Sequence, residues 1–237
     1  MKTFLISGAT GGIGIEIART LNKADNQLIL LGNKNMQELK EFEDKKNVHI
    51  FKCDLTNPTE LKTLSNNLKN FEKIDGFVFC SGVSLSMLVQ DVSEQDYDYI
   101  MDANFKSCVM LTKLVAKNMI FNKSGKIVFI SSMWGNVGAS MESVYSASKG
   151  AINTFTLSLA KELGPSGITV NAICPGLIDT KMNSGYSKAD IKALVDDTPL
   201  GRIGKPKDVA NLTEFLLSKK ADFITGQIIT IDGGISL

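Results

Sequence analysis

Short apolar segments alternate with longer segments of helical period along almost all of this 237-residue chain. The short segments are rich in β-branched and aromatic residues, which is typical of buried strands. Strands that alternate with helix-length segments indicate crossover connections, and therefore a parallel sheet. The seven predicted strands are residues 3–7, 27–31, 48–53, 74–80, 126–131, 168–173 and 227–231.

This order predicts the α/β class, with a Rossmann-type doubly wound sheet of seven parallel strands and helices on both faces. We expect one domain over residues 1–237, because no repeat, low-complexity tract or Pro/Gly-rich linker marks a boundary. The longest segment without a predicted strand is 175–206. Loops of this length inside a compact domain are usually functional, so residues 177–203 are predicted to form a substrate lid, with a short helix at 187–197.

The charge balance excludes several classes of partner. Lys and Arg number 26 against 25 Asp and Glu, which argues against a nucleic-acid partner or a membrane surface. The apolar run at the N-terminus is too short for a signal peptide, and no run is long enough to span a bilayer. We therefore expect a cytoplasmic protein.

The cysteines and the single histidine argue against metal chemistry. Cys53, Cys80, Cys108 and Cys174 form no CxxC pair, which favours buried, reduced thiols. One histidine, His49, is too few for an ordinary zinc site or a histidine-based nucleophile triad, so no metal is predicted. Its place within the third predicted strand indicates a structural residue.

A glycine-rich turn, SGATGGIG, follows the first strand and opens the first helix. Gly8, Gly12 and Gly14 allow a tight turn and a close approach of phosphate to backbone amides. The N-terminus of the helix then provides N–H groups and a positive dipole. Such turns also occur without a ligand, but the position in the first strand–helix unit favours a dinucleotide.

The end of the second strand bears on the choice of cofactor. An Asp or Glu there usually binds the ribose diol of NAD. This chain has Gly32, Asn33 and Lys34 instead, and amide and ammonium groups can hold a 2′-phosphate. NADP(H) is therefore favoured over NAD(H). If Lys34 is only a solvated turn residue, NAD remains admissible.

The stretch YSASK places Tyr145 four residues before Lys149, on one face of a predicted helix. A nearby ammonium favours the phenolate, so we expect Lys149 to lower the pKa of Tyr145 from its usual value of about 10. A YxxxK pair also arises by chance. The small residues between the two leave room for a cofactor and a substrate, which favours a functional pair.

Together with other segments, these motifs resemble the short-chain dehydrogenase/reductase family over essentially the whole chain. The matching segments run in family order: SGATGGIG, CDL at 53–55, MDANFKS, IVFISSMWG, YSASK, CPGLIDTKM and GQIITIDGG. Within this family the sequence is most similar to the 3-oxoacyl-acyl carrier protein reductases. The resemblance implies an NADP(H)-dependent oxidoreductase that forms a homotetramer.

The resemblance also implies the residues of the site. Asn104, Ser132, Tyr145 and Lys149 match the catalytic tetrad of the family. Tyr145 would be the general acid, and Lys149 would also hold the nicotinamide ribose. Ser132 would polarise the carbonyl, with Ser131 as its competitor, and Asn104 would hold a water that links Lys149 to solvent. The implied cofactor contacts are Gly8, Thr10, Gly12, Ile13, Gly14, Asn33, Lys34, Asp54 (adenine), Leu55, Gly82, Tyr145, Lys149, Pro175, Gly176, Ile178 and Thr180 (carboxamide).

The segment after the fourth strand departs from the family pattern. Where the family commonly has NNAG, this chain has FCSG, so Phe79 and Cys80 replace two asparagines whereas Gly82 is kept. We expect the loss of side-chain hydrogen bonds that brace the central strands. We therefore expect this change to affect local rigidity more than the chemistry.

The substrate is the least constrained part of the prediction. Met133, Trp134, Val137 and Met141 either line an apolar substrate pocket or fill the core. The leading substrate is a small-molecule carbonyl compound carried as a 3-oxoacyl thioester of acyl carrier protein. The alternatives are an alcohol, sugar or steroid dehydrogenase on the same scaffold and, from another class, a nucleotide-binding regulator without turnover.

Overall fold

The computed structural model describes residues 1–183, 185 and 187–237, and it contains the predicted sheet of seven parallel strands. Their order across the sheet is β3-β2-β1-β4-β5-β6-β7. Each predicted strand is present within two residues at either end. The strands are β1 (Lys2–Ser7), β2 (Asn26–Gly32), β3 (Val48–Lys52), β4 (Gly76–Phe79), β5 (Gly125–Ile130), β6 (Ile168–Pro175) and β7 (Ile228–Ile231).

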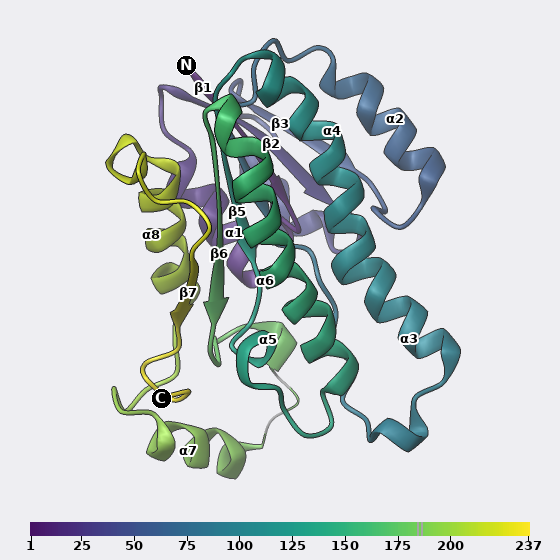
Figure 1. Ribbon diagram of the computed structural model, residues 1–237, viewed down its shortest axis with the longest axis vertical. Helices are drawn as coiled ribbons and strands as arrows, with labels where there is room; N and C mark the ends of the chain where they lie inside the picture. Colours follow the sequence, from purple (N-terminus) through teal and green to yellow (C-terminus); the bar gives the residue numbers. More distant parts are fainter. Residues whose placement is uncertain (184, 186) are drawn as a thin grey trace.

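Helices cover both faces of this sheet, as predicted (Figure 1). The α-helices are α1 (Gly12–Leu21), α2 (Pro58–Leu68), α3 (Glu94–Met101), α4 (Ser107–Phe121), α5 (Trp134–Val137), α6 (Ser143–Leu163), α7 (Lys188–Asp197) and α8 (Pro206–Leu217). Shorter turns are the 3-10 helices η1 (Met36–Phe42), η2 (Val89–Asp91), η4 (Gly164–Ser166), η5 (Lys181–Asn183) and η6 (Lys219–Ala221), and the π-helical turn η3 (Asp102–Lys106).

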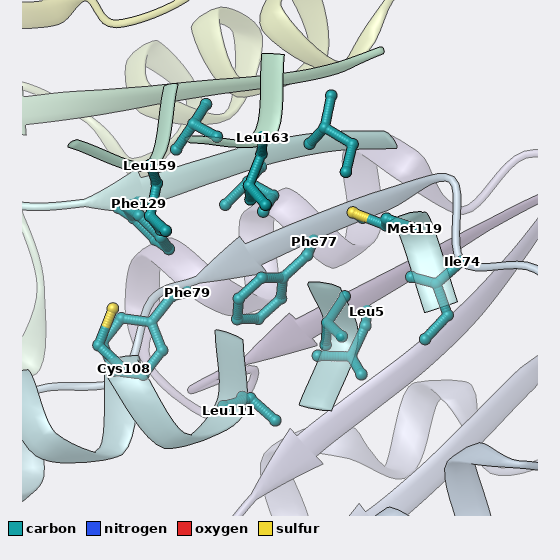
Figure 2. Close-up of a cluster of buried hydrophobic side chains, with 14 of the residues drawn as sticks. Leu5, Ile74, Phe77, Phe79, Cys108, Leu111, Met119, Phe129, Leu159 and Leu163 are labelled. Atoms are coloured by element: carbon teal, nitrogen blue, oxygen red, sulfur yellow. The ribbon is translucent and has the colours of Figure 1, made fainter. Parts of the chain in front are cut away.

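Successive residues of each central strand enter two different cores. Phe77 and Phe79 of β4 belong to the cluster under α2, α4 and α6, part of which is drawn in Figure 2. Val78, between them, points into the cluster under α1 and α8. Successive strand side chains point to opposite faces, so a sheet buried on both sides needs almost continuous apolar strands. This is the physical origin of the uninterrupted apolar runs in the sequence.

The departure at Phe79 and Cys80 is compensated by packing. Phe79 is fully buried in the α4 and α6 cluster, near Cys108 and Leu111 in Figure 2. The backbone N–H of Cys80 donates to Ser7 Oγ at 3.2 Å, which joins the end of β4 to the end of β1. The expected loss of bracing is therefore offset by apolar contact and by a hydrogen bond from the backbone.

The predicted lid contains the predicted helix. α7 begins after Ser187, whose hydroxyl accepts from Asp190 N–H while the Asp190 carboxylate accepts from Ser187 N–H. This reciprocal pair is a capping box, which defines where a helix starts. The lid also includes residues 184 and 186, which lie outside the described residues. In the described part, an isolated bridge between Ile178 and Gly204 holds its two ends together.

Two minor predictions concern the thiols and the histidine. All four cysteines are free. His49 packs edge-on against Phe71, with ring centroids 5.0 Å apart, and one of its ring nitrogens lies 3.0 Å from Gln27 Nε2, as expected of a structural residue. Among the described residues, none of the helices is both long enough and apolar enough to cross a bilayer.

Candidate active site

The predicted site residues gather at the carboxyl ends of the parallel strands. Gly8 follows β1, Gly82 follows β4, Ser132 follows β5 and Gly176 follows β6. In the sheet, β1 lies between β2 and β4, so successive crossovers leave it in opposite directions. A crevice at such a reversal of strand order is where open α/β sheets bind ligands.

At Gly8 and Gly14 the glycine turn has no space for a side chain. Gly8 has φ +64°, and a Cβ there would lie 2.7 Å from the carbonyl group of Cys80. A Cβ on Gly14 would lie 2.2 Å from Gly8 O, which brings α1 against the turn. α1 is preceded by Gly11 as its N-cap residue, which has no side chain to occupy the N–H groups of the first turn. The turn therefore leaves a helix N-terminus open to an anion.

A cavity of about 650 Å³ extends from this turn to the ends of β2, β3 and β4. All predicted cofactor contacts line it, except Pro175, Gly176 and Ile178, which line a neighbouring cavity. Its volume, and its extension along the ends of several strands, suit a dinucleotide. A Cβ on Gly12 would meet the Thr180 side chain at 2.8 Å, so the turn and the lid approach each other closely across the cavity.

At the far end of this cavity, Asp54 lies close to the residues that follow β2. Its Oδ1 accepts from Thr56 N–H at 2.9 Å and from Thr56 Oγ1 at 2.7 Å. The Thr56 hydroxyl is the main reason that the pKa of Asp54 is lowered, and Asn33 and Lys34 lower it further. Lys34 is exposed at the cavity lining, in reach of a ligand.

Tyr145, in the first turn of α6, lines both the large cavity and a second cavity of about 370 Å³. Burial raises the pKa of Tyr145 to about 12, a hydrogen bond with the Ser132 side chain acts in the opposite direction, and the charge of Glu142 raises it again. Ser132 Oγ also accepts from Trp134 N–H at 3.2 Å. The neighbouring Ser131 hydroxyl donates to Lys149 O at 3.1 Å and so braces α6.

The prediction that Lys149 lowers the pKa of Tyr145 is wrong for this structure. Lys149 is 4% exposed, and its Nζ donates to Ile130 O at 3.0 Å. Nζ lies 5.7 Å from the centroid of the Tyr145 ring. Burial lowers the pKa of Lys149 itself, because desolvation disfavours the ammonium. Desolvation is therefore the main cause of both pKa shifts, and the pKa of the phenol is raised instead of lowered.

Asn104 is completely buried in the π-helical turn η3. Its Oδ1 accepts from Val83 N–H at 2.7 Å, and its Nδ2 donates to Val83 O and to Ser148 Oγ, both at 2.9 Å. The side chain thus joins the loop after β4 to α6. A Cβ on Gly82 would lie 3.3 Å from both Asn104 Oδ1 and Lys149 Nζ, so this glycine packs against both.

The second cavity lies between Tyr145, Ser132 and the lid. Met133 and Trp134 line it as predicted, together with the lid residue Leu177. Val137 and Met141 do not: they are 57% and 47% exposed and lie outside its lining. Their apolar character suggested a pocket, but α5 ends at Val137, the chain turns at Gly138 with φ +73°, and both side chains are exposed to solvent.

Sequence reasoning missed several polar residues of this cavity, among them Ser84 and Glu142. The available signal was a carboxylate three residues before Tyr145, at the start of the predicted helix. The two cavities share Ile13, Ser131, Tyr145, Thr180 and Met182, so they form one continuous cleft with the phenol at the junction.

Comparisons with known proteins agree with this fold. Residues 8–236 match the profile of a family described as Enoyl-(Acyl carrier protein) reductase. The fold is that of a Rossmann-type oxidoreductase, and the chain belongs to the short-chain dehydrogenase/reductase family.

Several individual proteins are similar to the chain over its whole length. The uncharacterized oxidoreductase YmfI of Bacillus subtilis is 41% identical, covering 98% of this chain and 98% of its own. The 3-oxoacyl-[acyl-carrier-protein] reductase FabG of Rickettsia felis is 38% identical, covering 99% and 96%. A solved structure of a protein assigned as a gluconate dehydrogenase, from Agrobacterium tumefaciens, superposes with a TM-score of 0.93 at 28% identity, covering 99% and 96%.

Proposed function

We propose that this chain is an NADP(H)-dependent reductase of 3-oxoacyl thioesters carried by acyl carrier protein, acting in fatty acid synthesis. The observation that carries the proposal is the position of Tyr145, whose phenol lies where the two cavities meet and interacts with Ser132. A proton donor is thus placed between a nucleotide-sized cavity and a second, smaller cavity with much apolar lining. Residues 1–237 act as one oxidoreductase domain, with 177–203 as its lid.

Tyr145 is the general acid in this proposal. A phenol with a pKa of about 12 is fully protonated at neutral pH, so it is ready to donate a proton to the oxygen of a reduced carbonyl group. Ser132 lies beside the phenol and donates a hydrogen bond to the same carbonyl oxygen, which stabilises the negative charge that develops there. The chemistry that a bound NADP(H) supplies is hydride transfer to the carbonyl carbon.

Lys149 and Asn104 support the donor. The Lys149 ammonium is held at Ile130 O, facing the large cavity, where it binds the ribose beside the nicotinamide. Asn104 holds the loop after β4 against α6, which maintains the space in front of Lys149. In this proposal a water at Asn104 links Lys149 to solvent and so replaces the donated proton. The Asn104 side-chain amide serves mainly to position the surrounding backbone.

The preference for NADP(H) depends on the end of β2. Asn33 and Lys34 line the large cavity, where a carboxylate would repel a 2′-phosphate. Lys34 is exposed and carries the charge that such a phosphate would bind. The remaining predicted cofactor contacts line one of the two cavities, and each is proposed to bind the part of NADP(H) that lies beside it.

The choice of a 3-oxoacyl thioester is supported by relatives of the chain. The FabG proteins of Rickettsia felis and Buchnera aphidicola, both named as 3-oxoacyl-[acyl-carrier-protein] reductases, are 38% and 37% identical to it. Apolar side chains of Met133, Leu177 and Leu194 line the smaller cavity, as an acyl chain requires.

Location and assembly complete the proposal. We place the reaction in the cytoplasm, where the four free thiols remain reduced. The assembly is a homotetramer, supported by exposed apolar residues on α4 and α6: Met110, Phe121 and Leu157. Light scattering of the purified protein tests this directly, and a monomer at micromolar concentration would contradict it.

The experiment for the reaction measures NADPH oxidation with acetoacetyl thioesters, alongside ketones, alcohols and gluconate-type sugar acids. We expect the highest kcat/KM with the thioester. Tyr145→Phe should lower kcat by about 10³-fold while leaving the affinity for NADPH unchanged. Turnover of a sugar acid in preference to the thioester would replace the proposed substrate class. Cofactor binding without any turnover would indicate a nucleotide-binding regulator.

A further inference from the structure

Glu142 lies in the wall of the smaller cavity, three residues before Tyr145. We propose that Glu142, held by Ser84, selects substrates by charge: it admits neutral carbonyl compounds and excludes those with a free carboxylate. This inference rests on the proposed carbonyl reduction and specifies the substrate class of the same cavity.

The Glu142 carboxylate lies in the cavity wall and does not cap its own helix. Glu142 is the N-cap residue of α6, with φ −123° and ψ 26°, and it forms no side-chain cap hydrogen bond. Its Oε2 accepts instead from the hydroxyl of Ser84, in the loop after β4. Glu is not among the residues that commonly cap helices, so the contact with Ser84, and not the first turn of α6, is what holds this carboxylate.

The backbone just before Glu142 is held in place as well. Met141, immediately before Glu142, has φ +63°, a left-handed conformation that is uncommon for residues other than glycine. The N–H of Met87 donates to Met141 O at 2.7 Å and ties this turn to the loop that carries Ser84. Such conformations cluster at functional sites because the surrounding structure must hold them. Two segments that are distant in sequence therefore hold the carboxylate together.

Glu142 gives the cavity a negative charge. Among the described residues that line it, Glu142 is the only one with a formally charged side chain. The same charge contributes to the raised pKa of Tyr145, so the carboxylate interacts electrostatically with the proposed proton donor. A substrate carboxylate bound in a cavity of about 370 Å³ would lie close to Glu142 and be repelled.

The carboxylate also offers acceptor sites to a suitable substrate. Two carboxylate oxygens provide about four lone-pair sites, and the Ser84 hydroxyl uses one of them. An amide N–H or a hydroxyl on the carrier arm of a thioester can use another. A sugar acid or a free 3-oxoacid brings an anion to the same place.

The test compares two substrates with the same ketone and a similar carbon skeleton, ethyl acetoacetate and acetoacetate, which differ in charge. Glu142→Gln keeps an acceptor for Ser84 and removes only the charge. We expect the wild type to favour the ester. In Glu142→Gln the kcat/KM ratio of ester to acid should fall by about tenfold, which corresponds to about 1.4 kcal/mol, because acetoacetate is used better.

Glu43→Gln is the matched control, since Glu43 is exposed and lines neither cavity. It should leave the ratio unchanged. A ratio that is the same in Glu142→Gln and in the wild type, with both proteins folded to the same melting temperature, would overturn the inference.

A second arm separates this inference from the proposed reaction. If the wild type reduces neither compound, the proposed carbonyl reduction is wrong. Charge selection is then measured by calorimetry, as binding of the two compounds to the NADPH-loaded Tyr145→Phe variant. The dissociation constant of acetoacetate should fall about tenfold when Glu142→Gln is added, whereas that of the ester should not. Equal effects on both compounds, or no binding of either at millimolar concentration, would contradict the inference.

Discussion

The ammonium of Lys149, one turn of α6 after Tyr145, lies 5.7 Å from the centroid of the Tyr145 ring and donates to Ile130 O. The two groups are neighbours on the helix, as their spacing requires, but they are not an ion pair. Burial holds the phenol protonated and lowers the pKa of the ammonium. Burial thus shifts both groups toward their neutral forms, which is typical of a site that gives up stability for chemistry.

Replacing Lys149 with methionine should separate stability from activity. A buried ammonium costs desolvation energy, and an apolar side chain of similar length avoids that cost, so Lys149→Met should raise the free energy of unfolding by about 1 kcal/mol. The kcat of carbonyl reduction should fall at least about 10²-fold. Urea unfolding at pH 7 and steady-state kinetics measure the two effects.

The matched control is Lys113→Met, on the exposed side of α4, which should change neither quantity. If Lys149→Met were less stable than the wild type by more than 1 kcal/mol, the Ile130 hydrogen bond would outweigh the desolvation.

The raised pKa of Tyr145 predicts opposite pH behaviour for the two directions of reaction. Reduction needs the protonated phenol, so its kcat/KM should stay constant from pH 6 to about pH 9, well below a pKa of about 12. Oxidation of the alcohol needs the phenolate, so its rate should rise with pH over the same range. Glu142→Gln removes a charge that raises this pKa, so the rise should move to lower pH.

Initial rates in both directions, measured between pH 6 and pH 10, check this prediction. Glu43→Gln should reproduce the wild-type profile. A shift of the oxidation profile of Glu142→Gln to higher pH would show that Glu142 does not act through its charge.

The glycine turn predicts two very different outcomes for the same substitution. A Cβ on Gly14 would lie 2.2 Å from Gly8 O, a backbone atom that cannot move without opening the turn, so Gly14→Ala should cost about 3 kcal/mol of stability. At Gly11 the nearest atom is Gly8 O at 3.3 Å, and φ −83° suits any residue. Gly11→Ala should cost less than about 1 kcal/mol.

Urea denaturation of the two variants measures these costs, and cofactor titration measures the effect on the turn as a binding site. Equal stability of the two variants would contradict the proposed close packing of α1 against the turn.

The position of Lys34 predicts a loss that is specific to NADPH. Lys34→Ala should raise the dissociation constant of NADPH about tenfold, since a charge-assisted hydrogen bond to phosphate is lost, and should leave that of NADH unchanged. Fluorescence titration measures both constants. Lys45→Ala, an exposed lysine outside the cavity, is the control. If wild-type protein bound NADH as tightly as NADPH, the preference for NADP(H) would be wrong.

Much of the fold could be predicted because its signals are local. Apolar runs such as Phe4–Ile6 and Phe77–Phe79 are continuous since both faces of the sheet are covered, and a strand of this kind is recognisable from its own residues. The helix in the lid was also predictable, because Ser187 and Asp190 mark its start in the sequence.

The candidate site was predictable as a set of residues but not as a set of interactions. The spacing of Tyr145 and Lys149 placed both on one face of α6, and the structure brings Ser132 and the glycine turn to the same cleft. The direction of Glu142, by contrast, depends on Ser84, which lies 58 positions earlier in the chain. No local pattern contains such a partner.

The sequence by itself therefore determined the order of strands and helices, the glycine turn and the residue types at the strand ends, because each depends on neighbours in the chain. Only the tertiary structure decided that Val137 and Met141 face outward, that Asn104 joins two segments, and that the pKa of Tyr145 is raised. Desolvation and hydrogen bonding depend on which distant segments pack together, and those contacts exist only in the folded chain.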